Sequence, residues 1–111
     1  MVRHFKPDPI PREAVERILD LARRAPSAGY TQGQSFIVVM DPERCRAEAE
    51  TCAEAQYVKR CGHPRISEGP VPIVACTSEL AYHRRSREPD KLRPDGTEID
   101  WPVSSWYFDI G

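Results

Sequence analysis

The stretch that decides the fold is Ala25-Pro26-Ser27-Ala28-Gly29-Tyr30-Thr31-Gln32, which is followed at once by the apolar run 36–40. This pattern predicts that a helix ends, that a loop of small residues follows, and that a strand begins. Small side chains let the backbone approach a flat ligand closely, and we expect the backbone N–H groups of the loop to be free to bond such a ligand. The stretch therefore predicts a helix-to-strand connection, which is either a plain turn or a loop that a flat ligand can approach.

The segment before this loop is predicted to be a helix from Pro11 to Arg24. Proline suits the first position of a helix, because its missing N–H would have no partner there. The spacing i, i+3, i+4, i+7 gives the helix one apolar face, which consists of Val15, Ile18, Leu19 and Ala22. Pro26 and Gly29 then prevent the helix from continuing.

The segment after the loop is predicted to be a strand over 35–40, and its continuous apolar character is typical of a strand covered on both faces. The Asp-Pro-Glu sequence at 41–43 predicts a helix start, and that helix is expected to run to about Arg60. Its inward-facing residues are expected to be Cys45, Ala49, Cys52 and Ala53. A second apolar strand is predicted over 71–77, with Pro72 near its start.

The last third of the chain is predicted to contain two short helices separated by a long polar loop. The first helix is expected over 78–87. A basic cluster on this helix, which is either a solvated face or a contact for the phosphate of a ligand, consists of His83, Arg84, Arg85 and Arg87. The loop over 88–100 carries turn residues at 94–96, and a loop of this length is usually functional or disordered, so 78–100 is expected to form a lid-like region. Pro102 is expected to open the last helix.

Composition and charge limit the functions open to this chain of 111 residues. The length suits a single domain, 1–111, with a modest core. A net charge of −1, with acidic and basic residues interleaved, favours neither nucleic acid nor a membrane as a partner. No segment approaches the roughly 20 apolar residues that span a bilayer, and the polar start is unlike a signal peptide, so the cytoplasm is the expected compartment. The four cysteines lack the close pairs of a zinc site and are expected to be small buried hydrophobic residues.

The loop, the helix before it and the opening residues Val2-Arg3-His4-Phe5 together resemble the start of the nitroreductase family, whose members are FMN-dependent oxidoreductases. The resemblance implies an α+β fold, in which a small sheet flanked by helices forms the N-terminal part of the family fold. The family carries the pattern Ala/Ser-Pro-Ser-x-x-Asn-x-Gln-Pro-Trp before the strand. In this chain Tyr30 stands in place of the Asn, and Gly33-Gln34 stands in place of Pro-Trp.

The resemblance also implies that the sequence is truncated at both ends relative to the family. The family has an Arg-x-Ser-x-Arg/Lys pattern near its N-terminus, of which Arg3 matches the last residue, while the earlier Arg and Ser would precede Met1. The long central helix of the family opens near 107–111, and the later segment that completes the flavin site would follow Gly111. Such a partial fold leaves apolar surface exposed, so a homodimer is expected.

The resemblance implies no catalytic acid, base or nucleophile, because a bound flavin carries out the electron transfer itself. The implied cofactor-binding residues are Arg3, Pro26, Ser27, Ala28, Gly29 and Gln32. The implied substrate-contacting residues are Tyr30 and Tyr57, and no metal ligands are expected. Two structural alternatives stay open: the loop is a plain helix-to-strand turn, and Tyr57 caps the core at a helix end.

The function that the resemblance implies is FMN-dependent transfer of electrons from NAD(P)H to a nitroaromatic, a quinone or a similar small-molecule acceptor. The alternative is a catalytically silent relative that keeps the fold and acts as a binding or interaction module. A phosphate held by Arg3 alone loses charge-assisted hydrogen bonds worth about 1.5–3 kcal/mol each, which favours the alternative. A third possibility is that the sequence is part of a longer enzyme.

Overall fold

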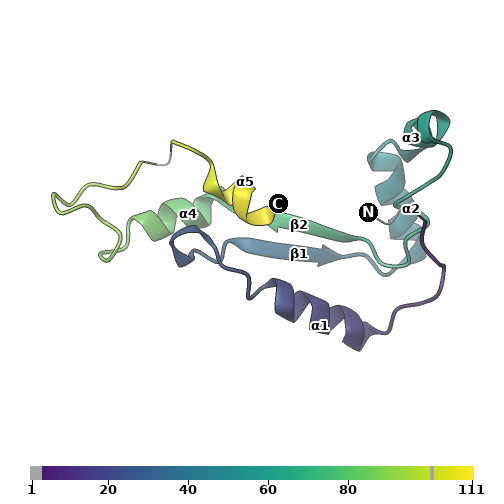
Figure 1. The fold of residues 1–111 in the computed structure, drawn as a ribbon, viewed down its shortest axis with the longest axis horizontal. Helices are drawn as coiled ribbons and strands as arrows, with labels where there is room; N and C mark the ends of the chain where they lie inside the picture. Colours follow the sequence, from purple (N-terminus) through teal and green to yellow (C-terminus); the bar gives the residue numbers. More distant parts are fainter. Residues whose placement is uncertain (1–3, 101) are drawn as a thin grey trace. The chain divides into compact units, whose positions relative to one another are not determined.

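The computed structural model describes residues 4–100 and 102–111, and Figure 1 shows the elements in order. Arg3 lies outside the described residues. The chain divides into two compact units: unit 1 consists of residues 1–16 and 37–74, and unit 2 consists of residues 17–36 and 75–111. The elements are the helices α1 (Arg12–Ala22), α2 (Pro42–Thr51), α3 (Glu54–Cys61), α4 (Glu79–Ser86) and α5 (Ser105–Ile110), the short 3₁₀ helix η1 (Ala28–Tyr30), and the strands β1 (Gln34–Val38) and β2 (Ile73–Thr77).

The two strands pair in an antiparallel sheet, which together with the helices confirms the predicted α+β class. The Val39 amide donates to the Pro72 carbonyl at one end of the pair, and the Ser78 amide donates to the Gly33 carbonyl at the other, both at 3.0 Å. The strands therefore run in opposite directions, as the arrows in Figure 1 show. Pro72 lies directly before β2, as predicted, so its missing N–H removes no bond from the strand.

β1 is covered on one face only, so the prediction of a strand covered on both faces is wrong for the described residues. Ser35 and Ile37 are exposed, whereas Gln34, Phe36 and Val38 are half-buried. This alternation is the period of two that a strand imposes on its side chains. The apolar side chain of Ile37 therefore lies on the open face of the sheet.

α1 confirms the predicted first helix, with a shorter C-terminal end. It begins directly after Pro11 and ends at Ala22, so Arg23 and Arg24 lie in the turn that follows and not in the last helical turn. The predicted apolar face is covered unevenly, from buried Val15 through half-buried Leu19 and Ala22 to exposed Ile18.

The prediction of one helix from 41–43 to about Arg60 is wrong, because α2 and α3 form as separate helices. Ala53 lies between them and adopts the left-handed conformation, with φ 55° and ψ 36°, which does not continue a right-handed helix. Cys45 and Ala49 are buried as expected. Cys52 and Ala53 are exposed, because the break takes them out of the helical register that would turn them inward.

A buried carboxylate at the start of α3 orders the loop that follows that helix. Glu54 Oε1 accepts hydrogen bonds from the amides of Arg65, Ile66 and Ser67 at 2.6, 2.5 and 3.3 Å, and Oε2 accepts a further bond from Ser67. Burial raises the pKa of Glu54, but the hydrogen bonds from Ser67, Arg65 and Ile66 outweigh burial and lower the pKa below its ordinary value. Unit 1 therefore stabilises Glu54 in its ionised form.

The four cysteines are free thiols that lie in different environments. Cys45 is buried and Cys76 is half-buried, but Cys52 and Cys61 are exposed, so the expectation of buried cysteines is wrong for these two. Across the part of the chain that the structure describes, no three His, Cys, Asp or Glu side chains are grouped so that they could hold a metal ion.

The elements of the last third agree in part with the sequence. α4 confirms the predicted helix over 78–87, and the Ser78 hydroxyl caps its first turn. The turn at 94–96 is confirmed as well, since Gly96 adopts a φ of 80° that suits glycine. The prediction that Pro102 opens the last helix is wrong, because residues 102 and 103 form a bend before α5. None of the helices in the described ranges has the length and apolar character needed to cross a membrane.

The core of unit 2 is built around Tyr82, whose side chain is fully buried. Its ring centroid lies 5.9 Å from that of Trp106, which is also buried. A Cβ at Gly33 would lie 2.8 Å from Tyr82 Cε2, a separation at which the two atoms would overlap. Only glycine therefore fits at this position, and its absent side chain lets the start of β1 lie close to α4.

Replacing Gly33 by Ala is expected to lower the free energy of unfolding by about 1–3 kcal/mol, because the new methyl group overlaps a buried ring. Urea unfolding followed by tryptophan fluorescence measures this change. The matched control is Gly69→Ala, since a Cβ at Gly69 meets only ordinary contacts at 3.6 Å. Equal stability of the two variants would contradict the packing argument.

Replacing Glu54 by Gln is expected to lower the free energy of unfolding at pH 7 by about 1–3 kcal/mol, because the charged acceptor of several amides is lost. The folded-state pKa of Glu54 is lowered, so its contribution is present above the pKa of the unfolded chain and is lost as the pH falls through the folded-state pKa. The stabilities of the natural protein and the variant should therefore converge in acid. Urea titrations at a series of pH values test this, with Glu50→Gln as the exposed control; a difference that stays constant down to the acid limit would refute it.

Candidate functional site

The loop between α1 and β1 adopts the left-handed backbone conformation at three residues. Gly29, Tyr30 and Gln32 have φ values of 64°, 56° and 54°. Glycine reaches this region freely, whereas a residue with a Cβ is disfavoured there by roughly 1–2 kcal/mol. Contacts within unit 2 must therefore hold Tyr30 and Gln32 in this conformation.

Side chains of the loop bond back to the loop itself. Ser27 Oγ accepts hydrogen bonds from the Gln32 amide at 2.7 Å and from Gln32 Nε2 at 3.2 Å. Gln32 Nε2 also donates to the Ala25 carbonyl at 3.3 Å. The Thr31 hydroxyl donates to the Ala28 carbonyl at 2.7 Å. The predicted site residues Ser27, Ala28 and Gln32 are thus brought together in one closed loop.

The expectation that the loop amides are free is wrong for most of them. The amides of Tyr30 and Thr31 donate to the carbonyls of Ser27 and Ala28, at 2.9 and 3.3 Å. The Gln32 amide is bound to Ser27 Oγ, as described above. The physical reason is that a tight turn brings each N–H within reach of an oxygen a few residues earlier in the chain.

Asp109 on α5 binds a further amide, that of Ala28, at the start of the loop. Its Oδ2 accepts hydrogen bonds from the Ala28 amide and from the Tyr82 hydroxyl, each at 2.7 Å. Burial, followed by the bond to Asp109, raises the pKa of Tyr82 to about 12, so its hydroxyl remains a donor at neutral pH. No local signal in the sequence predicts this arrangement, because 81 residues separate Ala28 from Asp109.

Arg85 on α4 makes another contact with the loop. Its Nε donates to the Gly29 carbonyl at 3.2 Å, while its terminal nitrogens pair with acidic side chains that follow the helix, including Asp90 at 2.7 Å. Arg87 pairs with Glu98, also at 2.7 Å. Two arginines of the predicted basic cluster are therefore already neutralised by acidic partners.

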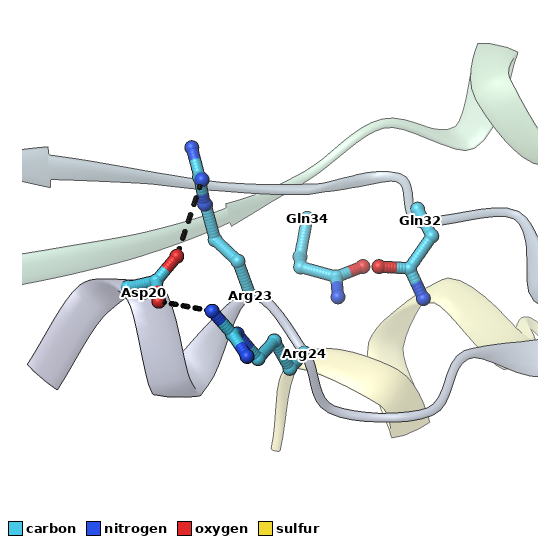
Figure 2. A pocket seen from close by; sticks show the side chains of 5 residues that line it. All are labelled: Asp20, Arg23, Arg24, Gln32 and Gln34. Atoms are coloured by element: carbon cyan, nitrogen blue, oxygen red, sulfur yellow. Dashed lines mark hydrogen bonds and ion pairs between the residues drawn. The ribbon is translucent and has the colours of Figure 1, made fainter. Parts of the chain in front are cut away.

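A polar hollow of about 380 Å³ opens beside the loop within unit 2. Figure 2 shows its lining residues, which are Asp20, Arg23, Arg24, Gln32 and Gln34. The Asp20 carboxylate lies 2.6 Å from Arg24 and 3.6 Å from Arg23. Gln34 Oε1 is buried, and no hydrogen-bond partner for it exists among the described residues. Two guanidinium groups against one carboxylate leave a net positive charge, which suits an anionic ligand.

The remaining predicted site residues lie apart from this hollow or outside the described residues. Pro26 and Tyr30 belong to the loop and are exposed, with Tyr30 at 76%. Tyr57 belongs to unit 1, where the Arg65 guanidinium lies 4.6 Å from the centroid of its ring. Arg3 is outside the described residues, so its role stays a prediction, as do the roles of Tyr30 and Tyr57.

The sequence matches the nitroreductase family over residues 1–103, and the chain belongs to that family. This confirms the resemblance that the loop and the opening residues indicate. Members of the family generally use flavin cofactors.

Similar proteins include two enzymes and one solved structure. An NADH dehydrogenase of Thermus thermophilus is 36% identical over 73 residues, which cover 66% of this chain and 32% of that protein. Iodotyrosine deiodinase 1 of Rattus norvegicus is 33% identical over 70 residues, covering 60% of this chain and 25% of that protein. The crystal structure of a putative NADH oxidase from Clostridium acetobutylicum matches with a TM-score of 0.57 and 28% identity, covering 72% of this chain and 43% of that chain. The chain thus spans about a quarter to a third of the length of these curated relatives.

Proposed function

We propose that this chain acts in an FMN-dependent oxidoreductase that passes electrons from NADH or NADPH to a nitroaromatic, a quinone or a similar small acceptor. The observation that carries the proposal is the closed loop of small residues beside a hollow with two arginines, in a chain of the nitroreductase family. Relatives named NADH dehydrogenase and NADH oxidase support a nicotinamide nucleotide as the reductant.

The described residues suit FMN at two points. Gly29 has no Cβ and Ala28 has only a methyl group, so a flat ring can approach the loop backbone. Arg23 and Arg24 carry guanidinium groups, which bind phosphate through paired hydrogen bonds. Arg3 is the further cation that the resemblance implies. When bound, the flavin supplies the redox chemistry, taking a hydride from the nicotinamide and passing electrons to the acceptor.

We expect side chains to supply most hydrogen bonds to the polar edge of a ligand, because most amides of the loop are already engaged. Gln34 Oε1 is buried without a partner in the described chain, so it is available to accept a bond from a ligand N–H. Gln32 is held by Ser27 and keeps the loop closed beside the hollow. These residues would bind and orient the cofactor, and they leave the redox step to it.

A halogenated phenol is a second candidate acceptor, and one comparison favours it. The relative named iodotyrosine deiodinase 1 matches 60% of this chain over 70 aligned residues. Tyr57, which carries the Arg65 guanidinium over its ring, is the substrate-contacting residue that the resemblance implies in unit 1. Assays of acceptor preference should therefore include an iodinated phenol beside nitro and quinone compounds.

We also propose that the chain forms a homodimer, because unit 2 exposes several large apolar side chains. The most exposed are Leu21, Val103, Tyr30 and Phe108, at 70%, 72%, 76% and 86%. Single exposed apolar residues are ordinary, but several in one small unit are typical of a surface that a partner covers. The dimers that are common in the nitroreductase family support this proposal.

Purified protein that has been incubated with FMN and freed of unbound ligand is expected to keep the visible absorbance of flavin. Ser27→Ala removes the oxygen that accepts two bonds from Gln32, so FMN should bind about tenfold more weakly to this variant. Fluorescence titration of FMN measures the affinity. Ser104→Ala is the matched control, since the Ser104 hydroxyl makes no capping bond.

Two outcomes of this titration contradict the proposal in different ways. A folded protein that keeps no FMN favours the catalytically silent relative, in which Asp109 and the oxygens of the loop occupy the amides that a ligand would need. A protein that keeps FMN but oxidises neither NADH nor NADPH with any acceptor is a flavin-binding module and not an enzyme.

Sedimentation equilibrium at micromolar concentration is expected to give the mass of two chains. Replacing Phe108 by Ser should weaken the dimer about tenfold or more, because an exposed aromatic side chain is the kind that contributes most at an interface. Arg84→Ser is the control, since it changes an exposed charged residue of unit 2. A monomeric mass for the natural protein would rule out the dimer.

A further inference from the structure

Asp109 lies where three segments of unit 2 converge. Its Oδ2 accepts one bond from the Ala28 amide of η1 and one from the Tyr82 hydroxyl of α4, both at 2.7 Å. η1 packs against both α4 and α5. The internal bonds of the loop join only loop residues, whereas this contact ties the loop to α4 and α5.

The carboxylate is itself held in place by a rigid donor. The Tyr82 ring is fully buried, lies against Gly33, and has its centroid 5.9 Å from that of Trp106. Burial and the bond to Asp109 raise the pKa of Tyr82 to about 12, so the hydroxyl keeps its proton. Because the Tyr82 hydroxyl is fixed, it sets the position at which the Asp109 carboxylate accepts a hydrogen bond from the Ala28 amide.

The loop requires an anchor of this kind. Ala28 is the first residue of η1 and comes directly before the residues with left-handed backbone, of which Tyr30 and Gln32 carry a Cβ. A residue with a Cβ keeps this conformation only where its surroundings enforce it. The bond to Asp109 fixes the start of the turn, and Arg85 adds a bond to the Gly29 carbonyl at 3.2 Å.

We propose that Asp109 is a positioning residue that fixes the shape of the loop 27–32 through the Ala28 amide and thereby sets the affinity of the loop for flavin. The statement about the loop stands on the contacts described here. The statement about affinity rests on the proposed function.

The first measurement uses the protein without FMN and follows backbone amide exchange by NMR. Asp109→Ala is expected to speed exchange of the Ala28 amide about tenfold or more, because a charge-assisted hydrogen bond is lost. Asp109→Asn keeps one carbonyl oxygen and should restore part of the protection. Asp100→Ala is the matched control, since Asp100 is an exposed acidic residue of unit 2 that pairs with Arg93 at 3.3 Å.

The second measurement is an FMN titration of the same variants. The affinity should fall about tenfold in Asp109→Ala, by less in Asp109→Asn, and not at all in Asp100→Ala. Tyr82→Phe removes the hydroxyl donor and leaves the bond between Asp109 and Ala28 possible, so its effect should be smaller than that of Asp109→Ala in both measurements.

Each result decides a separate point. Unchanged Ala28 exchange in folded Asp109→Ala overturns the proposal, and so does faster exchange with an unchanged affinity for FMN. Should Asp109→Ala fail to fold, Asp109→Asn decides by the same two measurements. A natural protein that binds no FMN overturns the proposed function, while the exchange measurement still decides whether Asp109 holds the loop.

Discussion

The complete burial of the Tyr82 side chain constrains the arrangement of unit 2. Its ring leaves no room for a side chain at Gly33. The absence of a side chain there lets the start of β1 lie close to α4. Its hydroxyl needs a partner, because an unpaired polar group in an apolar setting is costly, and Asp109 accepts its hydrogen bond. Asp109 also binds the Ala28 amide, so the packing of the Tyr82 ring influences the conformation of the candidate binding loop.

Unit 1 orders its loop by a comparable device. Glu54 binds the successive amides of residues 65–67, as Asp109 binds the amide that begins η1. Among the described residues the buried hydrophobic ones are few: Val15, Cys45 and Ala49 in unit 1, and Tyr82 and Trp106 in unit 2. With so little apolar packing, directional bonds to buried or half-buried carboxylates fix the loop shapes that non-directional hydrophobic contacts leave open.

Much of the fold could be predicted from sequence signals that act over a few residues. The features that depend on interactions between residues far apart in the chain could not. Pro11 and Ser78 mark the starts of α1 and α4 because their effects on the backbone are local. The break at Ala53 has no local signal, since alanine favours helix and the adjoining carboxylate binds amides 11–13 residues later. The candidate loop could likewise be located from its small residues, whereas the occupation of its amides depends on a carboxylate 81 residues away.

The left-handed backbone at Tyr30 offers a conformational explanation for the family pattern, which has Asn at this position. Asn adopts this conformation more readily than most residues with a Cβ, so the turn itself favours Asn whatever the ligand. This chain accepts Tyr on the same backbone and displays a phenol that is 76% exposed. The backbone conformation at this position can therefore stay the same while the side chain changes. One turn can present a short amide or a long aromatic ring, so relatives with the same fold can differ in the ligands that fit beside the turn.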